Sequence, residues 1–253
     1  MYWCLGMYAS ASTWTFNVVQ QIAATLIPAE PVLPLFVAEE MPSPEATAGR
    51  TVVAKTHGAP AFEQLARQAT AIIISIRDPR DAIASLLTHN KPPFEVALNV
   101  TAATARMCSR FMTDPRAVML RFEDRFFDDP TTVGRIAAKF PGVLPAADSA
   151  RIFAALRREA VDAFIANLAA VPSAVTQLDT VTGQMDTYDP LTGWHTHHAG
   201  RRAEIGRWWH ELTQAQVDAI EQRLGDWMQR FGYTRAEPPH AAYNLRVGRV
   251  EII

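Results

Sequence analysis

Hydrophobic positions along the chain alternate between short runs rich in β-branched residues and longer stretches with helical spacing. The short runs are typical of buried strands, and a repeat of three to four residues is typical of amphipathic helices. The predicted strands are Tyr2–Met7, Leu33–Ala38, Thr51–Ala54, Ala71–Ile76 and Ala117–Phe122. The helices predicted among them are Thr13–Ile27, Ala61–Gln68, Arg80–Thr88, Phe94–Met112 and Thr131–Phe140.

The order of these elements predicts the fold class. Strands that alternate with helices favour a parallel sheet, because each parallel connection needs a crossover and a helix usually supplies it. We therefore expect a three-layer α/β fold over residues 1–147, with a central, mostly parallel sheet and helices on both faces. Ligands of such sheets bind at the carboxyl ends of the strands, so candidate chemistry is sought there.

The second part of the chain, residues 148–253, has a different pattern. Helical spacing dominates Ala150–Ala170 and Gln214–Phe231, which predicts a mainly helical part within one single domain of residues 1–253. Residues Thr180–Gly200 contain glycines and an Asp-Pro pair but no period, so we expect a loop or lid there. The tail Asn244–Ile253 alternates apolar and polar residues, which fits a terminal strand or a homodimer contact.

Composition limits the classes of function. With 253 residues, of which 49% are hydrophobic, the chain can bury a full core. The net charge of -2 argues against nucleic acid as a partner, so any anion site must be local. Cys4 and Cys108 are too few for a disulfide framework. No apolar stretch approaches the roughly 20 residues of a membrane span, and no leader pattern opens the chain, so we expect a cytoplasmic protein.

The first strand leads into small hydroxyl residues and then into a helix. In the segment Tyr8–Trp14, backbone N–H groups and the positive end of the helix dipole would meet at one point, which favours a phosphate. An ordinary turn with a Ser or Thr that caps the helix is the alternative.

Cationic and titratable residues follow two further strands. Lys55 and His57 end the strand that begins at Thr51, and Arg77 ends the strand that begins at Ala71, with Ser85 about two helical turns beyond. A surface ion pair or a core histidine would explain each residue alone. Their occurrence at successive strand ends predicts one shared site.

Five segments, in this order, resemble the sulfotransferases that use 3'-phosphoadenosine 5'-phosphosulfate (PAPS). They are Ser10-Ala11-Ser12-Thr13-Trp14, Lys55-Thr56-His57, Arg77 with Ser85, Leu120–Asp124 followed by Asp129-Pro130, and Arg201–Trp208. The resemblance implies a P-loop-like sulfotransferase fold and transfer of a sulfuryl group from PAPS to a hydroxyl or amine. The acceptor would be a small molecule or a carbohydrate, the product would be adenosine 3',5'-bisphosphate (PAP), and no metal would be needed.

The resemblance also assigns roles to residues. It implies that His57 is the general base and that Lys55 neutralises charge on the leaving group. It places the 5'-phosphosulfate in the loop and the adenine beside aromatic rings, with the 3'-phosphate held by arginines and a serine. The binding residues assigned in this way are Ser10, Ala11, Ser12, Thr13, Trp14, Arg77, Ser85, Phe122, Arg201 and Arg202.

The chain also departs from the family pattern. Ala9 stands where the family usually has Lys or Arg, and Ala11 and Ala203 replace glycines. Ala11 must avoid a positive φ or carry strain of roughly 1 to 3 kcal/mol. These departures favour, as an alternative, a non-catalytic or weakly active nucleotide-binding protein with the same fold. An ATP-dependent kinase is disfavoured because the chain has no G-x-x-x-x-G-K-[S/T] run.

Two groups of polar residues receive simpler interpretations. His195, His197 and His198 could suggest zinc, but no cysteine or carboxylate lies at a matching ligand spacing, so we expect a polar lid beside the acceptor. Arg151, Arg157 and Arg158 fit a solvated helix face.

Overall fold

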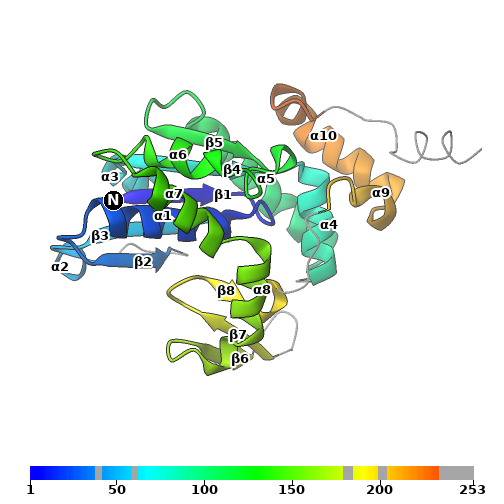
Figure 1. The fold of residues 1–253 in the computed structure, drawn as a ribbon. Helices are drawn as coiled ribbons and strands as arrows, with labels where there is room; N and C mark the ends of the chain where they lie inside the picture. The colour runs from blue at the N-terminus through cyan, green and yellow to red at the C-terminus, as the bar shows by residue number, and fades with distance from the viewer. Residues whose placement is uncertain (38–41, 59–61, 90, 179–184, 199–203, 234–253) are drawn as a thin grey trace, which may run out of the picture.

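A parallel sheet of five strands forms the centre of the computed structural model (Figure 1). The structure describes residues 1–37, 42–58, 62–89, 91–178, 185–198 and 204–233. The strands lie in the order β2-β3-β1-β4-β5, and every neighbouring pair is parallel, as the alternation of strands and helices predicts. Their bounds are β1 Tyr2–Gly6, β2 Val32–Phe36, β3 Thr51–Thr56, β4 Ala71–Ile76 and β5 Ala117–Arg121.

Helices cover both faces of this sheet (Figure 1). In β1, Trp3 and Leu5 join a buried cluster with the helices α4 (Pro79–His89), α5 (Phe94–Arg110) and α10 (Gln214–Arg230). Tyr2 and Cys4 join a second cluster with α1 (Ser12–Leu26), α6 (Thr131–Ala137) and α7 (Ala146–Ala155) on the other face. Alternate side chains of a strand point to opposite faces, so a strand that is apolar throughout can bury both faces. The predicted three-layer α/β fold is confirmed. The other helices are α2 Pro44–Thr47, α3 Phe62–Gln68, α8 Arg158–Ala166 and α9 Trp208–Glu211.

A second sheet corrects the prediction for residues 180–200. Strands β6 (Val175–Leu178), β7 (Met185–Asp189) and β8 (Trp194–His195) form a three-stranded antiparallel sheet, which lies beside α8 in Figure 1. The prediction of an aperiodic loop is therefore wrong for β7 and β8. All four residues of β6 are exposed, and β7 is largely polar, so backbone pairing defines these strands without the apolar alternation that sequence patterns reveal.

The predicted helix Ala150–Ala170 is also corrected. It is interrupted at Leu156 and Arg157, where Arg157 has extended backbone angles (φ -61, ψ 153), and a 3-10 turn follows at Leu168–Ala170. The apolar spacing continues through the break because α7 and α8 each bury one face.

Among the described residues, no helix is both long and apolar enough to cross a membrane. The predicted terminal strand Asn244–Ile253 lies outside the described residues.

Candidate functional site

A large pocket of about 950 Å³ opens at the carboxyl ends of β1, β3 and β4. Its volume lies within the usual range for sites that bind drug-sized ligands, roughly 300 to 1,000 Å³. The pocket brings together most of the residues that the sequence assigns to a site. Those that line it are Ala11, Ser12, Thr13, Trp14, Lys55, His57, Arg77, Ser85 and Phe122.

The loop between β1 and α1 has a left-handed backbone at two alanines. Ala9 has φ 56 and Ala11 has φ 60, a region of the backbone that favours glycine. Of the two predicted outcomes for Ala11, a positive φ with strain is therefore the one that the structure shows. Ala11 caps α1 without a side-chain hydrogen bond. The predicted alternative of a Ser or Thr cap is therefore wrong, and the first N–H groups of α1 have no side-chain partner from the capping residue.

Ser10 does not line the pocket. Its hydroxyl donates to the backbone oxygen of Met7 at 2.7 Å and lies 2.8 Å from the Ser75 hydroxyl, so it joins the loop to β4. Gly6 is also tightly packed, because a Cβ there would lie 2.4 Å from the Cβ of Ser12. These contacts set the path of the chain from β1 into α1.

Lys55 brings a cation to the start of α1. Its side chain is buried, and its Nζ donates to Thr13 Oγ1 at 2.7 Å. Burial lowers the pKa of Lys55 to about 8. A protonated Lys55 therefore adds positive charge beside the uncapped helix end, where Ala9 offers none.

His57 lies beside Lys55 on the same pocket wall. Its Nδ1 donates to the backbone oxygen of Gly6 at 2.8 Å, because a carbonyl can only accept, and its ring stacks on Tyr8 with 4.3 Å between centroids. Burial and then the charge of Lys55 lower the pKa of His57 to about 3. The ring is neutral at pH 7, with the lone pair on Nε2.

Arg77 ends β4 and contacts the loop that follows β1. Its guanidinium donates to the backbone oxygens of Ala9 at 3.0 Å and Glu204 at 2.6 Å, and it lies over the Phe122 ring at 4.1 Å. Its Nε is buried and has no hydrogen-bond partner among the described residues. Buried N–H groups are nearly always paired, so this donor is suited to an anionic ligand.

Asp81 of α4 holds the segment after residue 203 beside the pocket. The carboxylate of Asp81 accepts from the backbone N–H groups of Gly206 at 2.7 Å and Trp208 at 3.1 Å. Between them, Arg207 lines the pocket, and its charge contributes to lowering the pKa of Arg77 after the larger effect of burial. Arg207 was not among the predicted site residues, although it lies within the Arg201–Trp208 segment. Arg201 and Arg202, which it did assign, lie outside the described residues.

Trp14 and Arg158 both border the pocket, and both also make contacts within the protein. Trp14 borders the pocket, but it is largely buried and its indole N–H donates to the backbone oxygen of Leu156 at 3.0 Å. Arg151, Arg157 and Arg158 are exposed, which confirms the predicted solvated face, and Arg158 also lines the pocket and pairs with Asp162 at 3.4 Å. The break between α7 and α8 redirects the chain at this point, and a continuous helix pattern does not reveal it.

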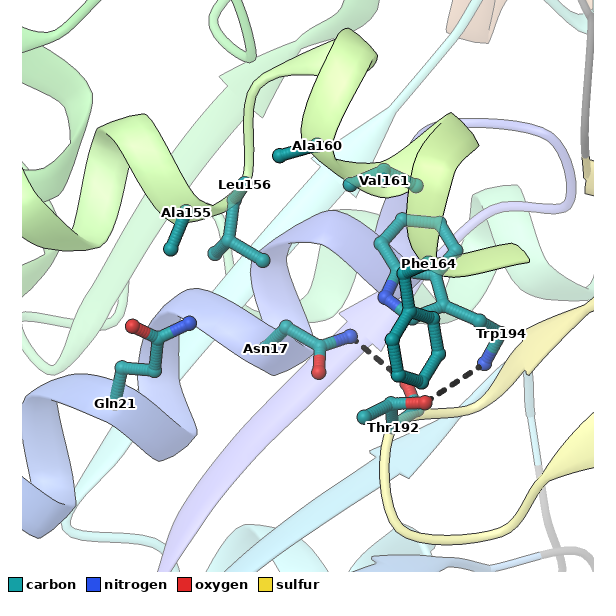
Figure 2. A pocket seen from close by; sticks show the side chains of 9 residues that line it. All are labelled: Asn17, Gln21, Ala155, Leu156, Ala160, Val161, Phe164, Thr192 and Trp194. Atoms are coloured by element: carbon teal, nitrogen blue, oxygen red, sulfur yellow. Dashed lines mark hydrogen bonds between the residues drawn. The ribbon is translucent and has the colours of Figure 1, made fainter. Parts of the chain in front are cut away.

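A smaller cavity of about 170 Å³ shows how the second sheet is attached to α1 (Figure 2). There, Asn17 of α1 donates to the backbone oxygen of Thr192 at 2.8 Å. The next residue, Gly193, has φ 67, and a Cβ on it would lie 3.7 Å from Lys55 Nζ. The β7–β8 loop therefore lies directly beside the Lys55–Thr13 pair, and Gly193 was not among the predicted site residues.

Comparisons with known proteins identify the fold. No family model matches the chain, and a search of curated proteins finds no match. Mouse sulfotransferase SULT7A1 complexed with PAP is similar in structure, with a TM-score of 0.57 and 12% identity over 90% of this chain and 84% of that chain. Retinol dehydratase with androsterone and inactive cofactor PAP gives a TM-score of 0.57 and 16% identity over 94% and 82% of the two chains. Retinol dehydratase with retinol and PAP gives 0.56 and 17% over 90% and 80%. The chain has the α/β fold of the sulfotransferases.

Proposed function

We propose that this protein transfers the sulfuryl group of PAPS to a hydroxyl or amine of a small-molecule or carbohydrate acceptor. One observation carries the proposal: an uncapped helix end, a buried lysine and a buried arginine face one pocket at adjacent strand ends. The similar structures of SULT7A1 and retinol dehydratase contain PAP, the product of such a reaction.

The residues present fit the two anionic ends of PAPS. The start of α1 and Lys55 would hold the 5'-phosphosulfate, because both line the pocket and offer positive charge. Arg77, with its unpaired Nε, and Ser85 would hold the 3'-phosphate, with Arg207 nearby. Each charge-assisted hydrogen bond of this kind contributes about 1.5 to 3 kcal/mol.

PAPS supplies an activated sulfuryl group when bound, and the protein supplies position and charge. His57 would accept the acceptor's proton at Nε2, because its Nδ1 is held by the Gly6 oxygen. A pKa of about 3 makes it a weak base in the free protein. An anionic ligand beside Lys55 would offset the cation that depresses this pKa, so His57 would become more basic when the site fills.

Lys55 is the cation that would replace the Lys or Arg missing at position 9. Arg80, the next arginine after Arg77, bonds to Asp78 at 2.7 Å and Glu221 at 3.2 Å, and it does not line the pocket. Losing a preorganised donor typically costs about 2.7 to 4 kcal/mol in such sites. A buried Lys55 that bonds to Thr13 at the start of α1 could supply that interaction.

Calorimetry with PAP and adenosine 5'-monophosphate (AMP), together with an assay of PAP release from PAPS, tests the proposal. We expect PAP to bind more tightly than AMP, because AMP lacks the 3'-phosphate, and PAPS to turn over with a hydroxyl or amine acceptor. Tight PAP binding with no turnover across small alcohols, phenols, amines and sugars would support the non-catalytic alternative. Equal affinities for PAP and AMP would refute a PAPS site.

The His57→Ala variant tests the general base separately. We expect kcat to fall by at least about 100-fold, the lower end for general base catalysis, while the affinity for PAP stays nearly unchanged. His210→Ala, which alters an exposed histidine of α9, is the control. A His57→Ala variant that turns over within a few-fold of wild type across pH 6 to 8 would remove His57 from the mechanism.

A further inference from the structure

Two histidines and an aspartate of the second sheet form a compact cluster. His195 Nδ1 lies 2.6 Å from Asp186 Oδ2, and His197 Nδ1 lies 3.4 Å from Asp186 Oδ1. Ligand atoms of all three residues lie within 4.8 Å of one another. The cluster joins β7, β8 and the 3-10 turn Thr196–His198.

The β7–β8 hairpin brings the carboxylate to histidines that are distant from it in sequence. Asp186 precedes His195 by nine positions, and the antiparallel pairing of β7 with β8 brings the two together. Thr196 Oγ1 then donates to Asp186 Oδ1 at 3.0 Å, which fixes the carboxylate against the turn. The prediction that no carboxylate lies at a ligand position beside these histidines is therefore wrong, because linear spacing does not show the pairing of two strands.

We propose that Asp186, His195 and His197 bind a divalent transition-metal ion of the zinc class. Imidazole nitrogens and a carboxylate oxygen are ligands that Zn²⁺ takes in proteins, and three protein ligands leave one position open. His195 and His197 also line the large pocket, so the open position would be accessible to a ligand there. This site is independent of the proposed transfer reaction.

The burial of Asp186 and the closeness of the two imidazole rings favour a bound cation over a solvent-exposed hydrogen-bonded cluster. The Asp186 side chain is only 16% exposed, and the ring centroids of His195 and His197 lie 4.8 Å apart. His198 is held nearby, with its Nδ1 accepting from the His195 backbone N–H at 3.3 Å. A metal ion would take the place of the hydrogen atom between His195 Nδ1 and Asp186 Oδ2, and the imidazole would then carry its proton on Nε2. The ion would also link two strands and a turn in the pocket wall.

Titration calorimetry of untagged protein, stripped with EDTA and dialysed, tests the proposal with ZnCl₂ as the probe. We expect saturable binding of one Zn²⁺ per chain. Asp186→Asn and His197→Ala should each weaken binding by at least about tenfold, since even residues that only orient ligands have effects of this size. His210→Ala, on α9 and outside the cluster, should leave the affinity unchanged.

The visible absorption of bound Co²⁺ reports its coordination independently of calorimetry. Wild-type protein should show an intense band of a four-coordinate site, and His197→Ala should lose it. If Asp186→Asn fails to fold by circular dichroism, His197→Ala and anomalous scattering from zinc-soaked crystals decide the question. Absence of saturable Zn²⁺ binding, binding unaffected by His197→Ala, or a zinc peak away from Asp186 would each overturn the proposal and leave a hydrogen-bonded cluster.

Discussion

Lys55 offers a sharp test of the electrostatics of the pocket. The side chain is 6% exposed, and within the described part of the chain it forms no ion pair with a carboxylate. Folding moves its pKa from 10.5 to about 8. Because each pH unit corresponds to about 1.4 kcal/mol, the buried charge should destabilise the folded protein by about 3 kcal/mol at pH 7.

Replacing Lys55 with Met should therefore stabilise the protein. Met keeps most of the side-chain volume and removes the charge, but the hydrogen bond to Thr13, worth about 1 kcal/mol, is lost. We expect a net gain of about 2 kcal/mol at pH 7, measured as a higher urea midpoint with an unchanged m value. The same variant should lose affinity for PAP if Lys55 binds the 5'-phosphate.

The pH dependence gives the sign of the effect. Between about pH 8 and 10.5 the unfolded chain holds the Lys55 proton more often than the folded protein does, so wild-type stability rises relative to Lys55→Met. The gain of the variant should vanish near about pH 10. Lys139→Met is the matched control, because it removes a lysine whose Nζ donates to the Pro115 oxygen at the surface, away from the pocket. A Lys55→Met variant that is less stable than wild type at pH 7, or whose advantage persists to pH 10, would refute the reasoning.

Three other substitutions test the pocket and its loop. Ser85→Ala should weaken PAP binding by roughly tenfold or more and leave AMP binding unchanged in calorimetry. Thr88→Ala, on the same helix, should alter the binding of neither nucleotide. Equal losses of affinity for both nucleotides in Ser85→Ala would contradict a 3'-phosphate role. Gly6→Ala should lower stability to urea by about 1 to 3 kcal/mol, because the new Cβ would lie 2.4 Å from that of Ser12, and an unchanged midpoint would disprove this. Ala11→Gly should raise stability by about 0.5 to 1 kcal/mol, since relief of about 1 to 2 kcal/mol exceeds the entropy cost; a loss would show that the left-handed backbone is not strained.

The sequence determined the central sheet and most of the pocket residues. Strands such as Ala71–Ile76 are apolar throughout, which identifies them as buried on both faces. In a parallel sheet the carboxyl ends of the strands lie at one edge, so residues that follow them, such as Lys55 and Arg77, meet by topology. The burial of a strand follows from its own apolar residues, and the parallel direction of the strands follows from the helices between them. Both can therefore be predicted from the sequence.

Only the tertiary structure decided which side chains complete the site. Arg207 comes near Arg77 because Asp81, 125 residues before Gly206, binds the backbone around it. Asp186 meets His195 through the pairing of β7 and β8, two largely half-buried strands that carry no apolar alternation. These contacts join segments far apart in sequence or depend on backbone hydrogen bonds, which form with almost any side chain, so the amino-acid pattern alone does not specify them.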